Sequence, residues 1–380
     1  MTSWSRTMYP FEQASGFVRN AWYVAALSEE VGEALLERRI LDEPILFYRT
    51  EDGEAVALSA TCPHRRMPLV LGRRVGDAVQ CAYHGFTFDS RGACVRVPTQ
   101  AQPAGRAALR RYPLVERWKW LWIWTGDPEL ADPDLIPDHA AMGIAEEWAN
   151  LPPLRLHVPA RYQLLVENLQ DLSHIGFLHG DYVDDEAWFR ERVHGARRPE
   201  GFVTYREGRS NPLSEFNEYL FPHAAPKVDQ ELRSVFVSPA LTYSGPIVRK
   251  ARELGGAPEY YGTLYAVHAI TPETPHSTHY FGTDCRDFRQ DDAALTETLY
   301  EMDKVVRLQD VEALGAIEQR LGDSGLPPEV SVPADMPALR VRKLVEALLL
   351  QERRAAASAG EPEERAAGRR TLRPRPARPR

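Results

Sequence analysis

The amino-acid sequence predicts a two-part α+β protein, in which an all-β domain precedes a domain that combines an antiparallel sheet with helices. Its 380 residues exceed the usual size of a single domain. Through the first third, short runs rich in Val, Ile, Tyr, Trp and Phe alternate with Asp-Gly, Gly-Asp and Arg-Gly turns, which is typical of antiparallel strands. Helical periodicity appears only beyond that region, together with further aromatic-rich strand patterns.

The first domain is expected over residues 17–125. Its predicted strands lie in four stretches, namely "RILDEPILFYR", "EDGEAVALSA", "GDAVQCAYHGFTFDSRGACVRV" and "LVERWKWLWIWTGDP". Such runs favour a small antiparallel sheet or barrel. Asp and Pro crowd together in "TGDPELADPDLIPD", at residues 125–138, which predicts a linker between the domains.

The second domain is expected over residues 126–358. Residues 160–180 predict a helix, because Leu side chains recur at helical spacing before a closing glycine. Alternating, aromatic-rich runs between 202 and 288 predict a second sheet with helices packed on it. Residues 291–321 predict one long helix or two consecutive ones, and residues 336–357 predict another helix.

Composition excludes several classes of function. The net charge of -8 disfavours a nucleic-acid partner, because phosphate binding depends on clustered Lys and Arg. No stretch approaches the roughly 20 apolar residues that span a bilayer. The first residues also lack the apolar core of a signal peptide, so we expect a cytoplasmic protein with no membrane partner. Residues 359–380, dense in Arg and Pro with little apolar content, predict a disordered tail.

Four cysteines are too few for a disulfide scaffold at this length, which fits a reducing compartment with thiols available to a metal. Two of them, Cys62 and Cys81, stand in Cys-x-His and Cys-x-x-His clusters separated by sixteen residues, with His64 and His84 as the histidines. Structural zinc usually pairs like with like, as C-x2-4-C and H-x3-5-H. One Cys and one His on each loop instead favour a two-iron cluster, with two thiolates on one iron and two imidazoles on the other.

These two clusters, opening in "CPHR" and closing in "YHG", resemble the Rieske iron-sulfur motif. The resemblance implies a [2Fe-2S] centre that transfers single electrons, with histidine ligands raising its reduction potential. Relatives that hydroxylate aromatic rings often carry Trp at the position of Phe86, and we expect little effect from this change. The remaining thiols, Cys94 and Cys285, fit no ligand pattern and are expected to be buried as small apolar side chains.

A second constellation gathers Asn168, Asp171, His174 and His179 within "ENLQDLSHIGFLHG". Each residue alone is more often structural or solvated than functional. On a continuous helix Asp171 and His174 would share one face, whereas the two histidines, five apart, would diverge by about 140°. Both histidines can therefore bind one metal only if the helix distorts or ends nearby, which the adjacent glycines permit.

The run matches every position of the N-x-x-D-x-x-H-x4-H signature, and is similar to the catalytic domain of Rieske non-heme iron oxygenases. The resemblance implies that His174, His179 and a later carboxylate hold a mononuclear iron(II) as a facial triad. The stretch "QDVEALGAIEQ" resembles the family's segment around that carboxylate, and this resemblance selects Asp310. Asp303, in "MDK", is the alternative, because relatives often show Asp-Lys at the ligand and the two aspartates lie seven apart on one helix face.

The resemblance also implies roles for the other signature residues. Asp171 would hydrogen-bond a histidine ligand of a Rieske cluster, with His84 as our choice, and would carry the electron path. Asn168 would lie near the iron and orient its surroundings. In the family this bridge crosses a subunit interface, so a head-to-tail homotrimer is expected.

Flanking segments such as "NAWYVAAL" and "THYF" resemble the vanillate O-demethylase branch of the family, which includes dicamba and toluenesulfonate methyl mono-oxygenases. That branch implies mono-oxygenation at a methyl or methoxy group of an aromatic substrate, with O2 as oxidant. Electrons would come from NAD(P)H through a separate flavin or iron-sulfur reductase, with or without a ferredoxin, because the chain has no Gly-rich dinucleotide motif.

Two alternatives remain at this point. Ring cis-dihydroxylation uses the same metals and differs mainly in where the substrate is held. A Rieske electron carrier or a zinc-binding module would need only the first domain and leaves the second constellation unexplained.

Pocket residues are expected from the 202–288 sheet and the helix around Ile175. Relatives often carry Trp in place of Gly282, which predicts an enlarged or reshaped substrate site.

Overall fold

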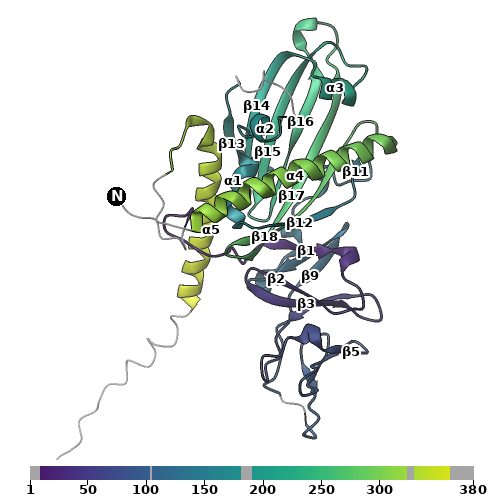
Figure 1. The fold of residues 1–380 in the computed structure, drawn as a ribbon, viewed down its shortest axis with the longest axis vertical. Coiled ribbons are helices and arrows are strands. Elements are labelled where there is room, and N and C mark those ends of the chain that lie inside the picture. Colours follow the sequence, from purple (N-terminus) through teal and green to yellow (C-terminus); the bar gives the residue numbers. More distant parts are fainter. Residues whose placement is uncertain (1–8, 103–104, 181–190, 323–328, 360–380) are drawn as a thin grey trace, which may run out of the picture.

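The computed structural model describes residues 9–102, 105–180, 191–322 and 329–359. Small antiparallel sheets form one end of an elongated molecule, and a large antiparallel sheet with its helices forms the other (Figure 1). The combined fold is α+β, as expected. The predicted tail lies outside the described residues apart from its first residue. In the described ranges, no helix is long and apolar enough to cross a membrane.

The N-terminal part is all β, which confirms the prediction. Three small sheets have the strand orders β1-β10-β9, β2-β3-β4 and β5-β6-β7-β8, and their pairings are antiparallel. The strands are β1 (Trp22–Leu27), β2 (Leu36–Ile40), β3 (Glu43–Arg49), β4 (Ala55–Ser59), β5 (Arg73–Val75), β6 (Ala78–Gln80), β7 (Thr87–Phe88), β8 (Cys94–Arg96), β9 (Leu114–Arg117) and β10 (Trp120–Trp124).

The predicted linker contains two short 3-10 helices, η3 (Pro128–Leu130) and η4 (Pro133–Leu135). Each begins after an aspartate, Asp127 or Asp132, whose carboxylate accepts a hydrogen bond from a backbone N–H two residues ahead. Proline then occupies the first helical position, where its missing N–H has no consequence. The Asp-Pro pairs that signalled a linker therefore act as helix starts.

A single large antiparallel sheet dominates the second part, as predicted for residues 202–288. Its order is β11-β18-β17-β16-β15-β14-β13, and β12 also pairs with β18. The strands are β11 (Ala149–Asn150), β12 (Leu154–Val158), β13 (His194–Arg198), β14 (Gly201–Pro212), β15 (Lys227–Ser238), β16 (Leu241–Lys250), β17 (Tyr260–Thr274) and β18 (Ser277–Arg286).

Side-chain alternation gives this sheet two different faces. On β17, Tyr265, Val267 and Ala269 belong to a buried cluster with Trp120 and Trp122 of β10, which joins the two parts of the molecule. The intervening residues of the same strand point to the opposite face, where the helices lie. A register slip of one residue would exchange the two faces, so this packing holds the register.

Five α-helices are described: α1 (Tyr162–Gln170), α2 (Ile175–Leu178), α3 (Glu215–Leu220), α4 (Ala293–Gly322) and α5 (Met336–Ala359). The 291–321 stretch forms one long helix, α4, which crosses the large sheet (Figure 1). Further short 3-10 helices are η1 (Ser28–Glu30), η2 (Leu69–Leu71), η5 (Ala140–Met142), η7 (Arg252–Leu254) and η8 (Pro333–Asp335).

The expectation of one helix over residues 160–180 is wrong. The chain leaves the helix at Asp171, whose backbone is extended with φ -101° and ψ 104°. Its carboxylate accepts hydrogen bonds from the backbone N–H and the hydroxyl of Ser173, at 2.7 and 2.5 Å. A side chain that binds the backbone two residues ahead competes with helical hydrogen bonds, so the helix stops and resumes as α2.

A buried ion pair fixes α1 against α4. Arg161, at the start of α1, donates through Nε and Nη2 to the two carboxylate oxygens of Glu318 on α4, at 2.7 and 2.8 Å. The side chains are only 6% and 9% exposed. Because removal of Arg161 leaves the buried Glu318 carboxylate with the exposed His276 ring as its remaining ion-pair partner in the described ranges, this pair contributes to the relative position of the two helices.

Replacing Arg161 with Met should therefore lower the free energy of unfolding by about 3–5 kcal/mol. Arg155→Met is the matched control, because Arg155 pairs with Glu30 at a more exposed site and should contribute only about 0–1 kcal/mol. Denaturant unfolding of both variants measures the difference. Equal losses in the two variants would contradict the role assigned to the buried pair.

Candidate metal centres and active site

The first cysteine loop is a tight turn that closes on Cys62. The Cys62 N–H donates to the carbonyl of Met67 at 2.9 Å, and the Arg66 N–H donates back to the Cys62 carbonyl at 2.9 Å. Arg66 adopts a left-handed backbone with φ 60°. This closure turns the cysteine and the histidine two residues later to the same side of the loop.

The second loop repeats the closure around Cys81. Its N–H donates to the carbonyl of Phe86 at 2.8 Å, and the Gly85 N–H donates to the Cys81 carbonyl at 3.1 Å. The left-handed position, with φ 69°, is here a glycine. A Cβ at Gly85 would also lie 2.8 Å from Cγ of Pro98, so both the backbone and the space around it favour glycine.

The side chains of the two loops face one another. Cys62 and Cys81 are 1% and 3% exposed, whereas the rings of His64 and His84 lie at the surface with centroids 4.5 Å apart. Burial, together with the nearby Cys81, raises the pKa of the Cys62 thiol. Two buried sulfurs and two exposed imidazoles fit a [2Fe-2S] cluster, whose positive irons would stabilise the thiolates.

The aromatic residue that replaces the more usual Trp takes part in this arrangement. Phe86 stacks on the His64 ring with centroids 4.6 Å apart and planes at 17°.

Of the two remaining cysteines, Cys285 is fully buried, as expected. The same expectation for Cys94 is wrong, because it lies on the short strand β8 and is only partly buried.

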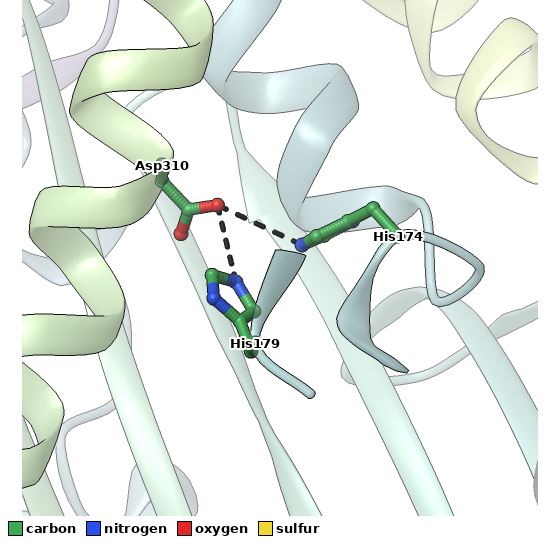
Figure 2. Close-up of side chains that lie close together, drawn as sticks. All are labelled: His174, His179 and Asp310. Carbon is green, nitrogen blue, oxygen red and sulfur yellow. Dashed lines mark ion pairs between the residues drawn. The ribbon is translucent and has the colours of Figure 1, made fainter. Parts of the chain in front are cut away.

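Figure 2 shows the second group, in which His174, His179 and Asp310 converge. The carboxylate oxygen Oδ1 of Asp310 lies 3.2 Å from Nε2 of His179 and 3.7 Å from Nε2 of His174. One ligand atom from each residue lies within 4.8 Å of the other two. The helix break after α1 brings the histidines together, and α4 supplies the aspartate.

The surrounding contacts orient these three side chains. Gln309 Oε1 lies 2.8 Å from Nδ1 of His179, so this nitrogen donates its hydrogen there and leaves Nε2 for a metal. Asn168 Nδ2 donates to Oδ1 of Asp310 at 3.1 Å. His174 Nδ1 is buried and makes no hydrogen bond within the described ranges. Two imidazoles and one carboxylate on one side of a cavity fit a mononuclear iron.

The surroundings shift the pKa values of the two histidines in opposite directions. Burial lowers the pKa of His174 despite the opposing charges of Asp310 and Asp171, so its ring is neutral near pH 7. Burial alone would lower the pKa of His179 as well, but contact with Asp310 raises it. A neutral imidazole is the form that binds a metal.

The two candidate aspartates of α4 have different surroundings. Asp303 does not reach the histidines within hydrogen-bonding range and instead accepts from Nε of Arg307 through both oxygens, at 2.7 Å each. Asp310 is the carboxylate beside the two histidines. Asp303 and Asp310 share one face of α4. Only Asp310 lies beside the two histidines that flank α2.

A cavity of about 220 Å³ adjoins the histidine–aspartate group. Its walls come from the helix-break region, the helix-facing side of the large sheet and α4. Apolar side chains make up much of the lining, including Leu172, Ile175, Leu232, Pro246, Leu264 and Val306. Such a lining suits an aromatic ring.

Two domain families match the two parts of the chain. The Rieske [2Fe-2S] domain family matches residues 21–114, and the vanillate O-demethylase oxygenase C-terminal domain family matches residues 158–351. The chain belongs to the Rieske oxygenases. Its cofactors are accordingly a [2Fe-2S] cluster and a mononuclear non-heme iron.

Named relatives of this Rieske oxygenase act on aromatic compounds. The iron-sulfur subunit of the toluene-4-sulfonate monooxygenase system of Comamonas testosteroni is 35% identical, over 88% of this chain and 98% of that protein. The oxygenase component of dicamba O-demethylase from Stenotrophomonas maltophilia is 34% identical, over 87% and 98%. A crystal structure of dicamba monooxygenase bound to 3,6-dichlorosalicylic acid superposes with a TM-score of 0.80, at 33% identity over 89% of this chain and 99% of that chain.

Sequence reasoning missed several residues of the Rieske oxygenase site. Gln309 stands next to Asp310 in the motif, but nothing in the motif shows that its amide meets His179. Of the two outcomes expected at Gly282, an enlarged or a reshaped site, the structure contradicts only the enlargement. A Cβ there would lie 2.4 Å from Nη1 of Arg307, so the guanidinium fills the space that the glycine leaves.

Iron content should distinguish the two aspartates. Asp310→Ala should lower the iron content from about three to about two atoms per chain, because the cluster remains and the mononuclear iron is lost. Asp303→Ala should keep both metals, at the expense of stability. Iron and sulfide analysis with the cluster's electron-resonance signal checks this, and loss of mononuclear iron only in Asp303→Ala would exclude Asp310 as the ligand.

Proposed function

We propose that this Rieske oxygenase is a terminal mono-oxygenase that acts on a methyl or methoxy group of an aromatic substrate. The observation that carries the proposal is the convergence of His174, His179 and Asp310 beside a largely apolar cavity. The named relatives, which demethylate or mono-oxygenate aromatic compounds, support the same reaction. O-demethylation would convert Ar–O–CH3, O2, NAD(P)H and H⁺ into Ar–OH, CH2O, H2O and NAD(P)⁺.

In this proposal Cys62 and Cys81 hold one iron of the cluster, and His64 and His84 hold the other. The mononuclear iron is held by His174, His179 and Asp310, and supplies O2 activation when bound. The residues around it fix geometry. Gln309 keeps the His179 ring turned with Nε2 inward, and Asn168 holds the Asp310 carboxylate in place.

We further propose that residues 17–125 form the electron-transfer domain and residues 126–358 the catalytic domain of a homotrimer. The strands around the cluster loops lie at one end of the molecule, and α2 lies in its other half (Figure 1). Such separation favours electron transfer between subunits. Asp171, at the helix break, would then hydrogen-bond His84 of the partner subunit, in a head-to-tail ring.

Replacing Asp171 with Asn tests the bridge. Asn keeps an oxygen to accept the hydrogen bonds from Ser173, so the helix break and both metals should persist. Product formation should nearly disappear, because the charge that pairs with a cluster histidine is lost. Wild-type turnover in this variant, measured with full iron and sulfide content, would rule out the bridging role.

The reaction itself is tested with purified enzyme, a surrogate reductase, NADH and a panel of methoxylated and methylated aromatic acids. Formaldehyde together with the corresponding phenol, or a hydroxymethyl product, should form in step with NADH consumption. A cis-diol without formaldehyde would instead identify a ring dihydroxylase. Zinc without sulfide in the purified protein would exclude an oxygenase altogether.

A further inference from the structure

The cavity wall contains a buried cation that the proposed reaction does not use. Arg307 of α4 has a side chain only 1% exposed and lies over Gly282 of β18, where a Cβ would meet its guanidinium. Both Arg307 and His268 of β17 line the cavity. The glycine therefore admits an arginine into the helix-facing side of the sheet.

Each nitrogen of the guanidinium has a defined acceptor. Nε donates to Asp303 at 2.7 Å, and Nη2 donates to Asp284 at 3.0 Å. Nη1 donates to Nδ1 of His268 at 2.8 Å and to the hydroxyl of Tyr280 at 2.9 Å. Two carboxyl groups beside one buried cation leave the arginine fixed in this orientation.

This contact determines which nitrogen of His268 carries hydrogen. A guanidinium can only donate, so Nδ1 must accept and is unprotonated. The Tyr280 hydroxyl, 2.6 Å from the same Nδ1, accepts from the guanidinium and therefore donates its own hydrogen to this nitrogen. Burial and the charge of Arg307 lower the pKa of His268 well below its ordinary value, so the ring is neutral. The hydrogen of a neutral ring with a bare Nδ1 is on Nε2, which lies 2.9 Å from Oγ of Ser244.

Ser244 consequently accepts from the histidine and keeps its own hydroxyl hydrogen for another group. It lies on β16 and lines the cavity. In the part of the chain that the structure describes, this hydroxyl makes one side-chain hydrogen bond, to His268. The hydroxyl hydrogen is thus available to a molecule inside the cavity.

We propose that Arg307, admitted by Gly282, acts through His268 to make Ser244 a hydrogen-bond donor into the cavity, which selects aromatic substrates that carry an acceptor oxygen. This inference rests on the proposed function, because it takes the cavity as the substrate site. Ser244 is the specificity-determining residue, and His268 and Arg307 are positioning residues. A substrate without the oxygen would leave the half-buried Ser244 hydroxyl without an acceptor.

Binding of two isosteric probes to the anaerobic holoenzyme tests the proposal. Para-methylacetophenone has a carbonyl oxygen where para-isopropenyltoluene has a CH2 group. The ratio of their dissociation constants isolates the acceptor oxygen from shape. In Ser244→Ala the preference for the ketone should fall by about fivefold to tenfold relative to wild type, while the hydrocarbon binds at least as tightly as it does to wild type, because no hydroxyl is left unsatisfied.

Ser277→Ala is the matched control, because Ser277 bonds Thr274 in the β17–β18 turn, away from the cavity. This variant should keep the wild-type ratio. A ratio that Ser244→Ala leaves within about twofold of wild type, or no measurable binding of the ketone to wild type, overturns the proposal.

Two further variants test the positioning residues. Gly282→Ala displaces the guanidinium without removing its charge, and Arg307→Lys removes its forked geometry. Either variant, if folded by thermal unfolding, should lower the ketone preference while hydrocarbon binding persists. A merely structural role would change both affinities together. An unchanged ratio in the folded variants would exclude Arg307 from the relay.

The outcomes separate this inference from the proposed reaction. The expected ratios without any oxygenated product would leave the recognition by Ser244 standing and reject the proposed reaction. Oxygenation of methoxylated aromatics, together with a ratio of dissociation constants that Ser244→Ala does not change, would support the proposed reaction and reject the recognition by Ser244.

Discussion

The two-residue alternation of side chains across the large antiparallel sheet is the constraint on which the rest of the structure depends. One set of β17 residues packs against Trp120 and Trp122 and so joins the sheet to the N-terminal part. The alternate set, including His268, faces the helices and forms a wall of the cavity. Because the apolar packing on one side holds the register, it also fixes which polar groups reach the site on the other.

The break in the helix after α1 determines where the two histidines of the metal site point. A continuous helix would send His174 and His179 in different directions. Asp171 ends that helix through hydrogen bonds to Ser173, and the two imidazoles then converge on Asp310. Asp171 therefore has two roles. Its hydrogen bonds to Ser173 bring the metal-binding histidines together, and in the proposed function it also carries the electron path.

The polar wall of the cavity shows how a buried charge can be tolerated beside a substrate. Arg307 lies between Asp303 and Asp284, and burial together with Asp303 raises the pKa of Asp284 well above its ordinary value. The guanidinium is therefore held between two carboxyl groups and orients the neighbouring hydrogen bonds.

The sequence by itself determined the α+β architecture, the two cysteine–histidine loops and the cluster of Asn168, Asp171 and the histidines. These features depend on short stretches, since a tight turn or a strand pattern needs only neighbouring residues. Tertiary structure decided that Asp310 rather than Asp303 meets the histidines, that Gln309 orients one of them, and that Arg307 occupies the space over Gly282. Each of these contacts joins segments far apart in the chain, so spacing along one helix could not distinguish residues that share a face.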